Sequence, residues 1–290
     1  MKTYTIKDFN QQFSDEDACL DWLRQHRFPE KIGCPVCKQP RLFHRVKARK
    51  VYECDHCGYQ ISPTAGTILH KSATSLRSWF YAAYLMASTK TGISAKQLER
   101  ELGVTYKTAW RMFTQIRKLM NEGISPLTGE VEVDETYIGG KRRGKRGRGA
   151  AGKTIVMGMT ERNGNAVAKV VPDVKRNTLL PMIMQHLDTP SNCVVYTDEL
   201  PSYDTVSRLG YAHEVVQHAA KEYVSGNAHV NTCESLWSTI KRGIDGVNHH
   251  VDPLYLQGYL DSYVYRYNHR KDETPMFESL LNRIFEVACS

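Results

Sequence analysis

The 290-residue sequence predicts an α/β protein in which a mixed β-sheet with flanking helices follows a cysteine ribbon and a helical region. Two observations predict this fold class. Two Cys-x-x-Cys pairs stand near the N-terminus, and strand-like and helix-like patterns alternate from residue 129 onward. We therefore expect four parts: a helical segment (1–31), a zinc ribbon (32–62), a helix-turn-helix region (75–123) and the α/β domain (129–290).

The composition favours a globular protein that binds a polyanion. Hydrophobic residues make up 41% of the chain, which is enough to bury a core. Lysine and arginine outnumber the acids by 39 to 31, and the resulting charge of +8 fits a nucleic-acid partner, although an ordinary charged surface gives the same count. No apolar run approaches the roughly 20 residues that cross a membrane, and the N-terminus lacks a signal peptide's apolar segment, so we expect a cytoplasmic protein.

The cysteine pairs predict a zinc ribbon. Cys34 and Cys37 form one pair, Cys54 and Cys57 the other, with 16 residues between the pairs. Four thiolates complete a tetrahedral zinc site with no open position, so we expect one structural zinc ion. A cytoplasmic protein of this size argues against disulfides, and no βαβ pattern supports redox chemistry. The basic residues of the ribbon either contact DNA or cover a solvated hairpin.

The region 75–123 predicts a helix followed by a helix-turn-helix. Apolar residues recur at helical spacing, Gly103 supplies the turn, and Thr105 is an N-cap for the last helix. A purely structural helix pair has the same pattern, but the net charge and the ribbon favour DNA binding. The exposed leading residues of the last helix would make the major-groove contacts: Tyr106, Lys107, Thr108 and Arg111.

Two acids interrupt or end predicted strands in the last part of the chain. Apolar and polar residues alternate around Asp134, and the apolar run 192–198 ends in Asp198. Asn163-Gly164 marks a hairpin between two further strands. Because α/β sheets place their ligand sites at the carboxyl ends of strands, the two aspartates are candidates for one site.

A predicted helix at 229–243 supplies a third acid. Residues three, four and seven apart share a helix face, so Glu234 and Lys241 lie on the same side of this helix. Asn231 lies on that side too, one turn before Glu234. A glutamate–lysine pair alone is common on solvated helices. The two aspartates upstream give this pair its interest.

The three acids could meet at one edge of the sheet. Clustered carboxylates repel one another unless cations neutralise them, and Mg²⁺ prefers carboxylate and phosphate oxygens. Two such ions support phosphoryl transfer on a DNA backbone. Three other acids compete as ligands: Glu132, Glu135 and Glu199. We rank Glu132 and Glu135 lower because neither is expected where the other acids converge.

The segment 141–153 is basic and rich in glycine. It holds seven lysines or arginines, four glycines and no acid, so it cannot pack a core. Such a loop suits DNA phosphates, and the alternative is a solvated hairpin tip. The candidate DNA-binding residues are Lys141, Arg142, Arg143, Lys145, Arg146 and Arg148.

Several sequence blocks resemble the DDE transposases of insertion sequences. VEVDETYIGGK, YTDE, HVNTCESLWSTIKRGIDG and YRYNHR are similar to blocks of the bacterial group that joins a zinc ribbon to an RNase H-like catalytic domain. The likeness covers roughly residues 15–285. The spacing from Glu234 to Lys241 resembles the DDE-K form of the motif.

The resemblance implies a DNA transposase with an RNase H-like sheet. It would bind the terminal inverted repeats, cut to leave a 3′-hydroxyl, and join that end to target DNA. Asp134, Asp198 and Glu234 would hold two Mg²⁺ or Mn²⁺ ions, Lys241 would contact a phosphate, and Asn231 is a further candidate ligand. A homodimer or higher oligomer on DNA, at a bacterial nucleoid, is expected.

Two alternatives come from other functional classes. A DNA-binding regulator with an inactive catalytic domain is disfavoured because all three acids are present. A simple metal-dependent nuclease would cut DNA without recognising ends or joining them.

Overall fold

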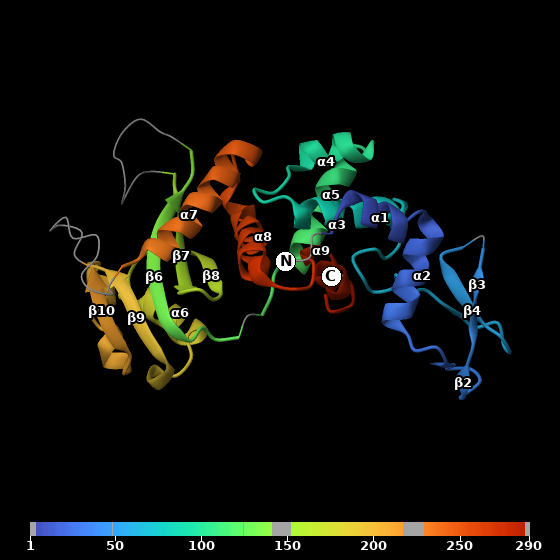
Figure 1. The fold of residues 1–290 in the computed structure, drawn as a ribbon, viewed down its shortest axis with the longest axis horizontal. Helices are drawn as coiled ribbons and strands as arrows, with labels where there is room; N and C mark the ends of the chain where they lie inside the picture. Colours follow the sequence, from blue (N-terminus) through green and yellow to red (C-terminus); the bar gives the residue numbers. More distant parts are fainter. Residues whose placement is uncertain (1–3, 48, 124, 141–151, 217–228, 288–290) are drawn as a thin grey trace. The chain divides into compact units, whose positions relative to one another are not determined.

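The computed structural model describes residues 4–47, 49–123, 125–140, 152–216 and 229–287. The chain divides into two compact units (Figure 1). The first comprises Met1–Thr89, Ile93–Leu119 and Asp272–Ser290, and the second Lys90–Gly92 and Met120–Lys271.

Helices form most of the first unit. They begin where the sequence supplies caps: the side chains of Thr5, Asp15, Ser75 and Ser94 each accept a backbone N–H of the helix that follows. The described helices of this unit are α1 (Ile6–Gln12), α2 (Glu16–Arg27), α3 (Leu76–Ser88), α4 (Ala95–Leu102), α5 (Tyr106–Leu119), α9 (Met276–Asn282) and the 3₁₀ turn η8 (Arg283–Phe285). Gly103 takes the left-handed conformation between α4 and α5, as the helix-turn-helix prediction requires.

Five short strands form the ribbon in the first unit. They are β1 (Ile32–Gly33), β2 (Pro40–Arg41), β3 (Phe43–Val46), β4 (Val51–Cys54) and β5 (Gln60–Ile61). β1 pairs with β2, and β3, β4 and β5 form an antiparallel sheet. The two turns that carry the cysteine pairs are thereby held by strand pairing.

A five-stranded mixed sheet forms the centre of the second unit. Its strands are β6 (Gly129–Ile138), β7 (Thr154–Glu161), β8 (Ala166–Val171), β9 (Cys193–Asp198) and β10 (Ala212–Val216), in the order β10-β9-β6-β7-β8. β6, β7 and β8 are antiparallel neighbours, whereas β9 runs parallel to β6 and β10 parallel to β9. The predicted mixed sheet with flanking helices is confirmed.

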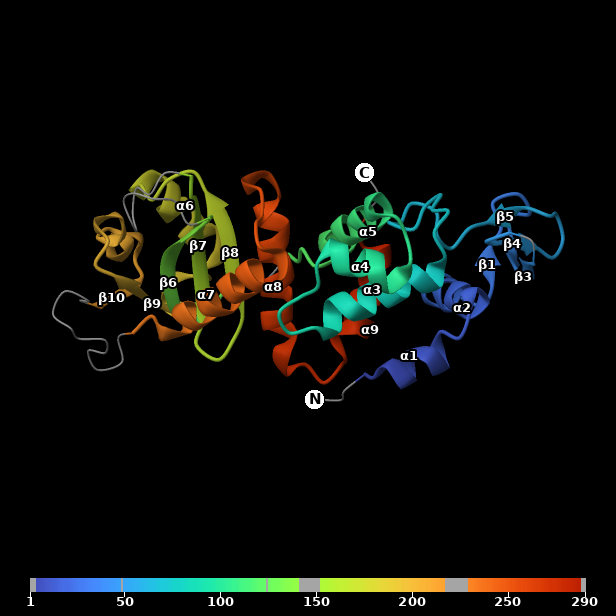
Figure 2. The same ribbon diagram turned by 90° about the horizontal axis from the view of Figure 1, so that it is seen from above.

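Helices cover both faces of this sheet (Figures 1 and 2). On one face α6 (Arg176–His186) packs against Val131 and Val133, and on the other α7 (Asn231–Gly243) and α8 (Leu256–Asn268) pack against Val156 and Ala168. Short helical turns complete the unit: η1 (Pro190–Asn192), η2 (Pro201–Tyr203), η3 (Val206–Leu209), η5 (Ile244–Asn248), η6 (Pro253–Tyr255) and η7 (His269–Lys271).

The last helix belongs to the first unit, although its sequence position predicts that it is part of the α/β domain (129–290). Phe277 of α9 is buried, and its ring centroid lies 5.9 Å from that of Phe9 and 6.0 Å from that of Phe13. The apolar face of α9 thus completes an aromatic core at the other end of the sequence. Within the described residues, no helix is long and apolar enough to span a membrane.

Candidate active site

The four predicted zinc ligands converge. Their sulfur atoms lie within 4.8 Å of one another, with 3.5 Å between Cys34 and Cys57 and 3.9 Å between Cys37 and Cys54. A zinc ion with bonds of about 2.3 Å to four sulfurs places those sulfurs about 3.8 Å apart. The four cysteine side chains therefore have the chemistry and the spacing of a structural zinc site.

The two predicted aspartates also converge, at the edge where β9 ends. The pairing of β6 with β9 ends at Val133 and Thr197, so Asp134 and Asp198 are the next residues of two parallel strands. Asp134, Asp198 and Glu135 each offer an oxygen within 4.8 Å of the others. Two carboxylate ligands of one Mg²⁺ ion lie about 3 to 4 Å apart, so this group fits a divalent cation.

Glu135 corrects the ranking made from the sequence. The sequence ranks Glu135 lower because it is not expected where the other acids converge. Its side chain leaves β6 on the opposite face from that of Asp134. Because β9 ends beside Glu135, the Glu135 carboxylate has an oxygen within 4.8 Å of both aspartates. Tyr203 Oη donates a hydrogen bond to Glu135 Oε2 at 3.2 Å. Glu199, the other competing acid, is exposed and lies outside this group of three carboxylates.

Burial and mutual repulsion disfavour the charged form of Asp134 in this group of carboxylates. Burial, and next the charge of Glu135, raise the pKa of Asp134 to about 7, and Asp198 adds to the rise. A hydrogen bond from Trp237 acts in the opposite direction. A bound cation would remove the repulsion, which is the behaviour expected of metal ligands.

Glu132 serves a structural purpose, in line with its lower ranking as a ligand. Its side chain is fully buried and accepts hydrogen bonds from Arg162 Nε (3.0 Å), Thr232 N (2.7 Å), Thr232 Oγ1 (2.8 Å) and Cys233 N (3.1 Å). His229 Nδ1 lies 3.0 Å from the same carboxylate. Glu132 thus caps the first turn of α7 from the neighbouring strand, and α7 has no side-chain cap of its own.

Helix α7 carries the remaining predicted residues past Asp134. Glu234 and Lys241 lie one turn before and one turn after Trp237, whose indole nitrogen bonds to Asp134. Burial lowers the pKa of Lys241 while the charge of Asp134 raises it, so the ammonium lies within electrostatic range of that carboxylate. Glu234 is exposed and lies outside the 4.8 Å group, and Asn231 is exposed at the first position of the helix.

The predicted DNA-reading residues lie at the start of α5. Tyr106 is 48% exposed, and Lys107 and Arg111 are exposed as well. Thr108 is partly buried, and its hydroxyl lies 3.0 Å from that of Thr105. The basic loop residues Lys141, Arg142, Arg143, Lys145, Arg146 and Arg148 lie outside the described residues.

Comparison with known families decides what kind of protein carries these sites. Residues 126–268 match the ISXO2-like transposase domain, and residues 14–60 match the transposase zinc-ribbon domain. A Halobacterium salinarum protein named "Uncharacterized protein in transposable element ISH50" is 30% identical over 250 residues, which are 79% of this chain and 83% of that protein. The chain belongs to the ISXO2-like transposase family.

Two further similarities are weaker. An "Uncharacterized transposase-like protein" of Haemophilus influenzae is 28% identical to this ISXO2-like transposase over 99 residues, covering 34% of this chain and 77% of the relative. A chain of the "pre-cleavage Mos1 transpososome" crystal structure is 12% identical, with a TM-score of 0.23 over 73% of this chain and 79% of that one. So low a TM-score does not bear on the fold of this transposase.

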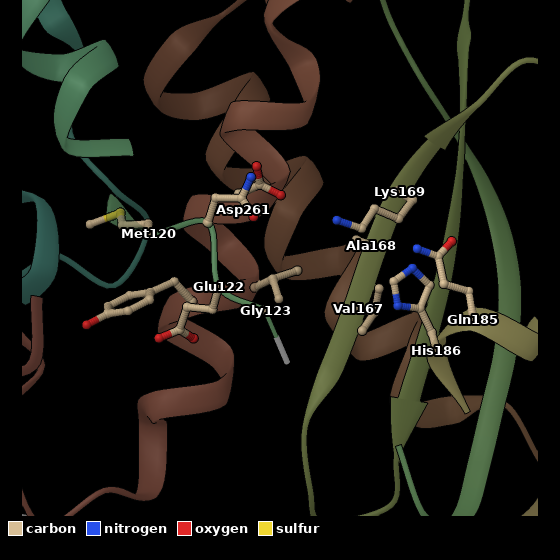
Figure 3. A pocket seen from close by; sticks show the side chains of 12 residues that line it. Met120, Glu122, Gly123, Val167, Ala168, Lys169, Gln185, His186 and Asp261 are labelled. Carbon is tan, nitrogen blue, oxygen red and sulfur yellow. The ribbon is translucent and has the colours of Figure 1, made fainter. Parts of the chain in front are cut away.

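The second unit also contains a cavity of about 370 Å³ (Figure 3). β8 and α6 supply Lys169, Gln185 and His186 on one side, and Glu122 and Asp261 stand on the other. Burial, and then the charge of Lys169, lower the pKa of His186. Of the predicted catalytic and DNA-binding residues that the structure describes, none lines this cavity.

Proposed function

We propose that this transposase binds the terminal inverted repeats of its insertion sequence and, with divalent metal ions, cuts and joins DNA strands. The observation that carries the proposal is the convergence of Asp134 and Asp198 at the ends of two parallel paired strands, in a chain of a transposase family. The charge of +8 supports a DNA partner.

The carboxylates define the reacting end of the proposed site. Asp134 and Asp198 would hold two Mg²⁺ or Mn²⁺ ions, which activate the attacking oxygen and stabilise the leaving oxygen when bound. Lys241 lies within electrostatic range of Asp134 and would contact a phosphate oxygen beside the metal site. In this way the helix supplies a positive charge next to a negatively charged cluster.

We propose Glu234 as the third acid, as in the DDE motif. It precedes Trp237 by one turn on α7, and Trp237 contacts Asp134, so Glu234 belongs to the helical segment that faces the site. Glu135 is a second candidate because its carboxylate already lies in the group. Calorimetric Mn²⁺ titration of Glu234→Gln and Glu135→Gln separates them, since only loss of a ligand weakens binding strongly.

The first unit would recognise the DNA ends. One zinc ion held by the four cysteines would fix the ribbon, and the start of α5 would enter the major groove through Tyr106, Lys107 and Arg111. The basic segment 141–153 would contact phosphates. Because transposition joins two ends, we expect a homodimer or a higher oligomer on DNA.

The test is an assay with labelled element ends, target DNA and Mg²⁺, scored for end binding, nicks and joined products. Asp134→Asn and Asp198→Asn should abolish nicking and joining while end binding persists, because each removes a charged ligand at nearly constant shape. Glu199→Gln, next to Asp198 but exposed and outside the group, is the matched control and should retain activity.

Each alternative gives its own result in this assay. End binding without any cleavage by the wild type would identify a regulator. Cleavage without end preference and without joined products would identify a nuclease. Cleavage by Asp198→Asn at the wild-type rate would refute the proposed active site.

A further inference from the structure

Trp237 connects helix α7 to Asp134 by a hydrogen bond. Its Nε1–H donates to Asp134 Oδ2 at 3.0 Å, and the tryptophan is only 4% exposed. An indole nitrogen is only a donor, so it requires an acceptor when it is buried. A hydrogen bond to a carboxylate is stronger than one between neutral groups, so this contact fixes the orientation of Asp134.

A glycine on the next strand makes room for the indole. Gly158 of β7 pairs with Asp134 in the sheet, and a Cβ atom at Gly158 would lie 2.4 Å from Cζ2 and 2.6 Å from Cη2 of Trp237. No side chain other than hydrogen leaves the ring where it is. The ring therefore lies directly against β7 at Gly158, in the position from which its N–H reaches Asp134.

The rest of the indole is held by the apolar core between the sheet and the helices. Val156, Ile240 and Leu260 belong to the same buried cluster as Trp237. The donor is thus fixed from three sides: by its helix, by the glycine strand and by this cluster. A rigid donor of this kind acts on a metal ligand as outer partners generally do, by setting its direction.

We infer that Trp237, seated on Gly158, is a positioning residue for the metal-binding carboxylate Asp134, and that its N–H group is what the metal site depends on. With Oδ2 held by the indole, the plane of the carboxylate is set relative to Asp198. This inference rests on the proposed function, because it presupposes a cation at Asp134 and Asp198.

The decisive variant is Trp237→Phe, which keeps most of the ring and removes the N–H. Trp79→Phe is the matched control, because Trp79 is also buried and donates its Nε1–H to Ser72 Oγ at 2.9 Å, in the first unit. Mn²⁺ binding to the full-length proteins is measured by calorimetric titration, and their melting temperatures are measured without added Mn²⁺. Both variants should lose some thermal stability, whereas Trp237→Phe alone should bind Mn²⁺ about tenfold more weakly.

Two further variants separate positioning from general destabilisation, and a terbium measurement locates the ion. Terbium(III), a hard oxygen-binding ion, should show indole-sensitised emission in the wild type and in Trp79→Phe, and loss of this emission in Trp237→Phe, which lacks the sensitising indole, would place the ion beside Trp237. Gly158→Ala, which displaces the ring without removing it, should also weaken Mn²⁺ binding. In an Asp134→Asn background, Trp237→Phe should change Mn²⁺ affinity no further, because its effect passes through Asp134.

DNA cleavage gives a second readout. Saturating Mn²⁺ should restore cleavage by Trp237→Phe, which loss of folded protein would not allow. Equal Mn²⁺ affinities for Trp237→Phe and Trp79→Phe, with Asp198→Asn still weakening binding, would overturn this inference alone. Wild-type protein that binds no Mn²⁺, or binds it independently of Asp198, would overturn both the inference and the proposed metal site.

Discussion

Replacing Glu132 by alanine should destabilise the second unit far more than replacing its neighbour Glu130. Glu132 is fully buried and accepts from Arg162, Thr232 and Cys233, so its removal leaves buried donors without an acceptor. The side chain of Arg162 is itself only 12% exposed. Water therefore cannot readily replace the missing carboxylate.

The size of the effect follows from these contacts. Removing one partner of a buried, hydrogen-bonded ion pair costs about 3–5 kcal/mol. For a unit of about 150 residues, each kcal/mol lowers the melting temperature by about 2–4 °C. Glu132→Ala should therefore lower the melting temperature of the second unit by roughly 6–20 °C.

Glu130→Ala is the matched control because Glu130 binds the same arginine from an exposed position. Its oxygen lies 3.2 Å from Arg162 Nη1, and its side chain is 45% exposed. A pair of this kind contributes at most about 1 kcal/mol. Scanning calorimetry of both variants measures the difference, and equal melting temperatures would refute the claim that Glu132 fixes the start of α7.

Three shorter predictions concern the metal and DNA contacts. Cys57→Ser should lower the zinc content and weaken DNA-end binding without altering the melting of the second unit, because structural zinc contributes about 10 kcal/mol or more to folding a small domain; freshly purified wild type with less than one zinc per chain would count against this. Lys241→Ala should reduce joining and flatten the salt dependence of DNA binding by about one counterion; an unchanged slope with unchanged joining removes Lys241 from the site. Lys107→Ala should weaken end binding more than Lys118→Ala, its exposed counterpart in the last turn of α5, and equal losses would argue against groove entry by the start of that helix.

The positions of the two aspartates could be predicted because each depends on a local pattern. Alternation around Asp134 gives its strand and face, and the apolar run before Asp198 gives a buried strand that ends in an acid. Asp134 and Asp198 then meet if their two strands are parallel neighbours, and β6 and β9 pair in this way. The position of Glu135 in the same group depends on where β9 stops, and that is a property of the pairing rather than of either segment.

The contacts that orient the site could not be predicted, because they join distant residues. The Trp237–Asp134 bond spans 103 positions and the Tyr203–Glu135 bond spans 68. Helical spacing places Trp237 on the helix that carries Glu234 and Lys241, and nothing local shows that its nitrogen meets a carboxylate. The same holds for α9, whose apolar face is evident in the sequence while its packing partners, Phe9 and Phe13, lie at the other end of the chain.

Glu132 and Asp134 show what separates a structural acid from a metal ligand. Both project from the same face of β6 toward α7, two residues apart. Glu132 receives N–H and O–H donors from Arg162, Thr232 and Cys233, so its charge is compensated inside the protein. Asp134 receives the indole N–H and faces two further carboxylates, so its negative charge is reinforced and its pKa rises to about 7. The first acid anchors the helix, and the second, held by that helix, is the one whose charge a cation would compensate.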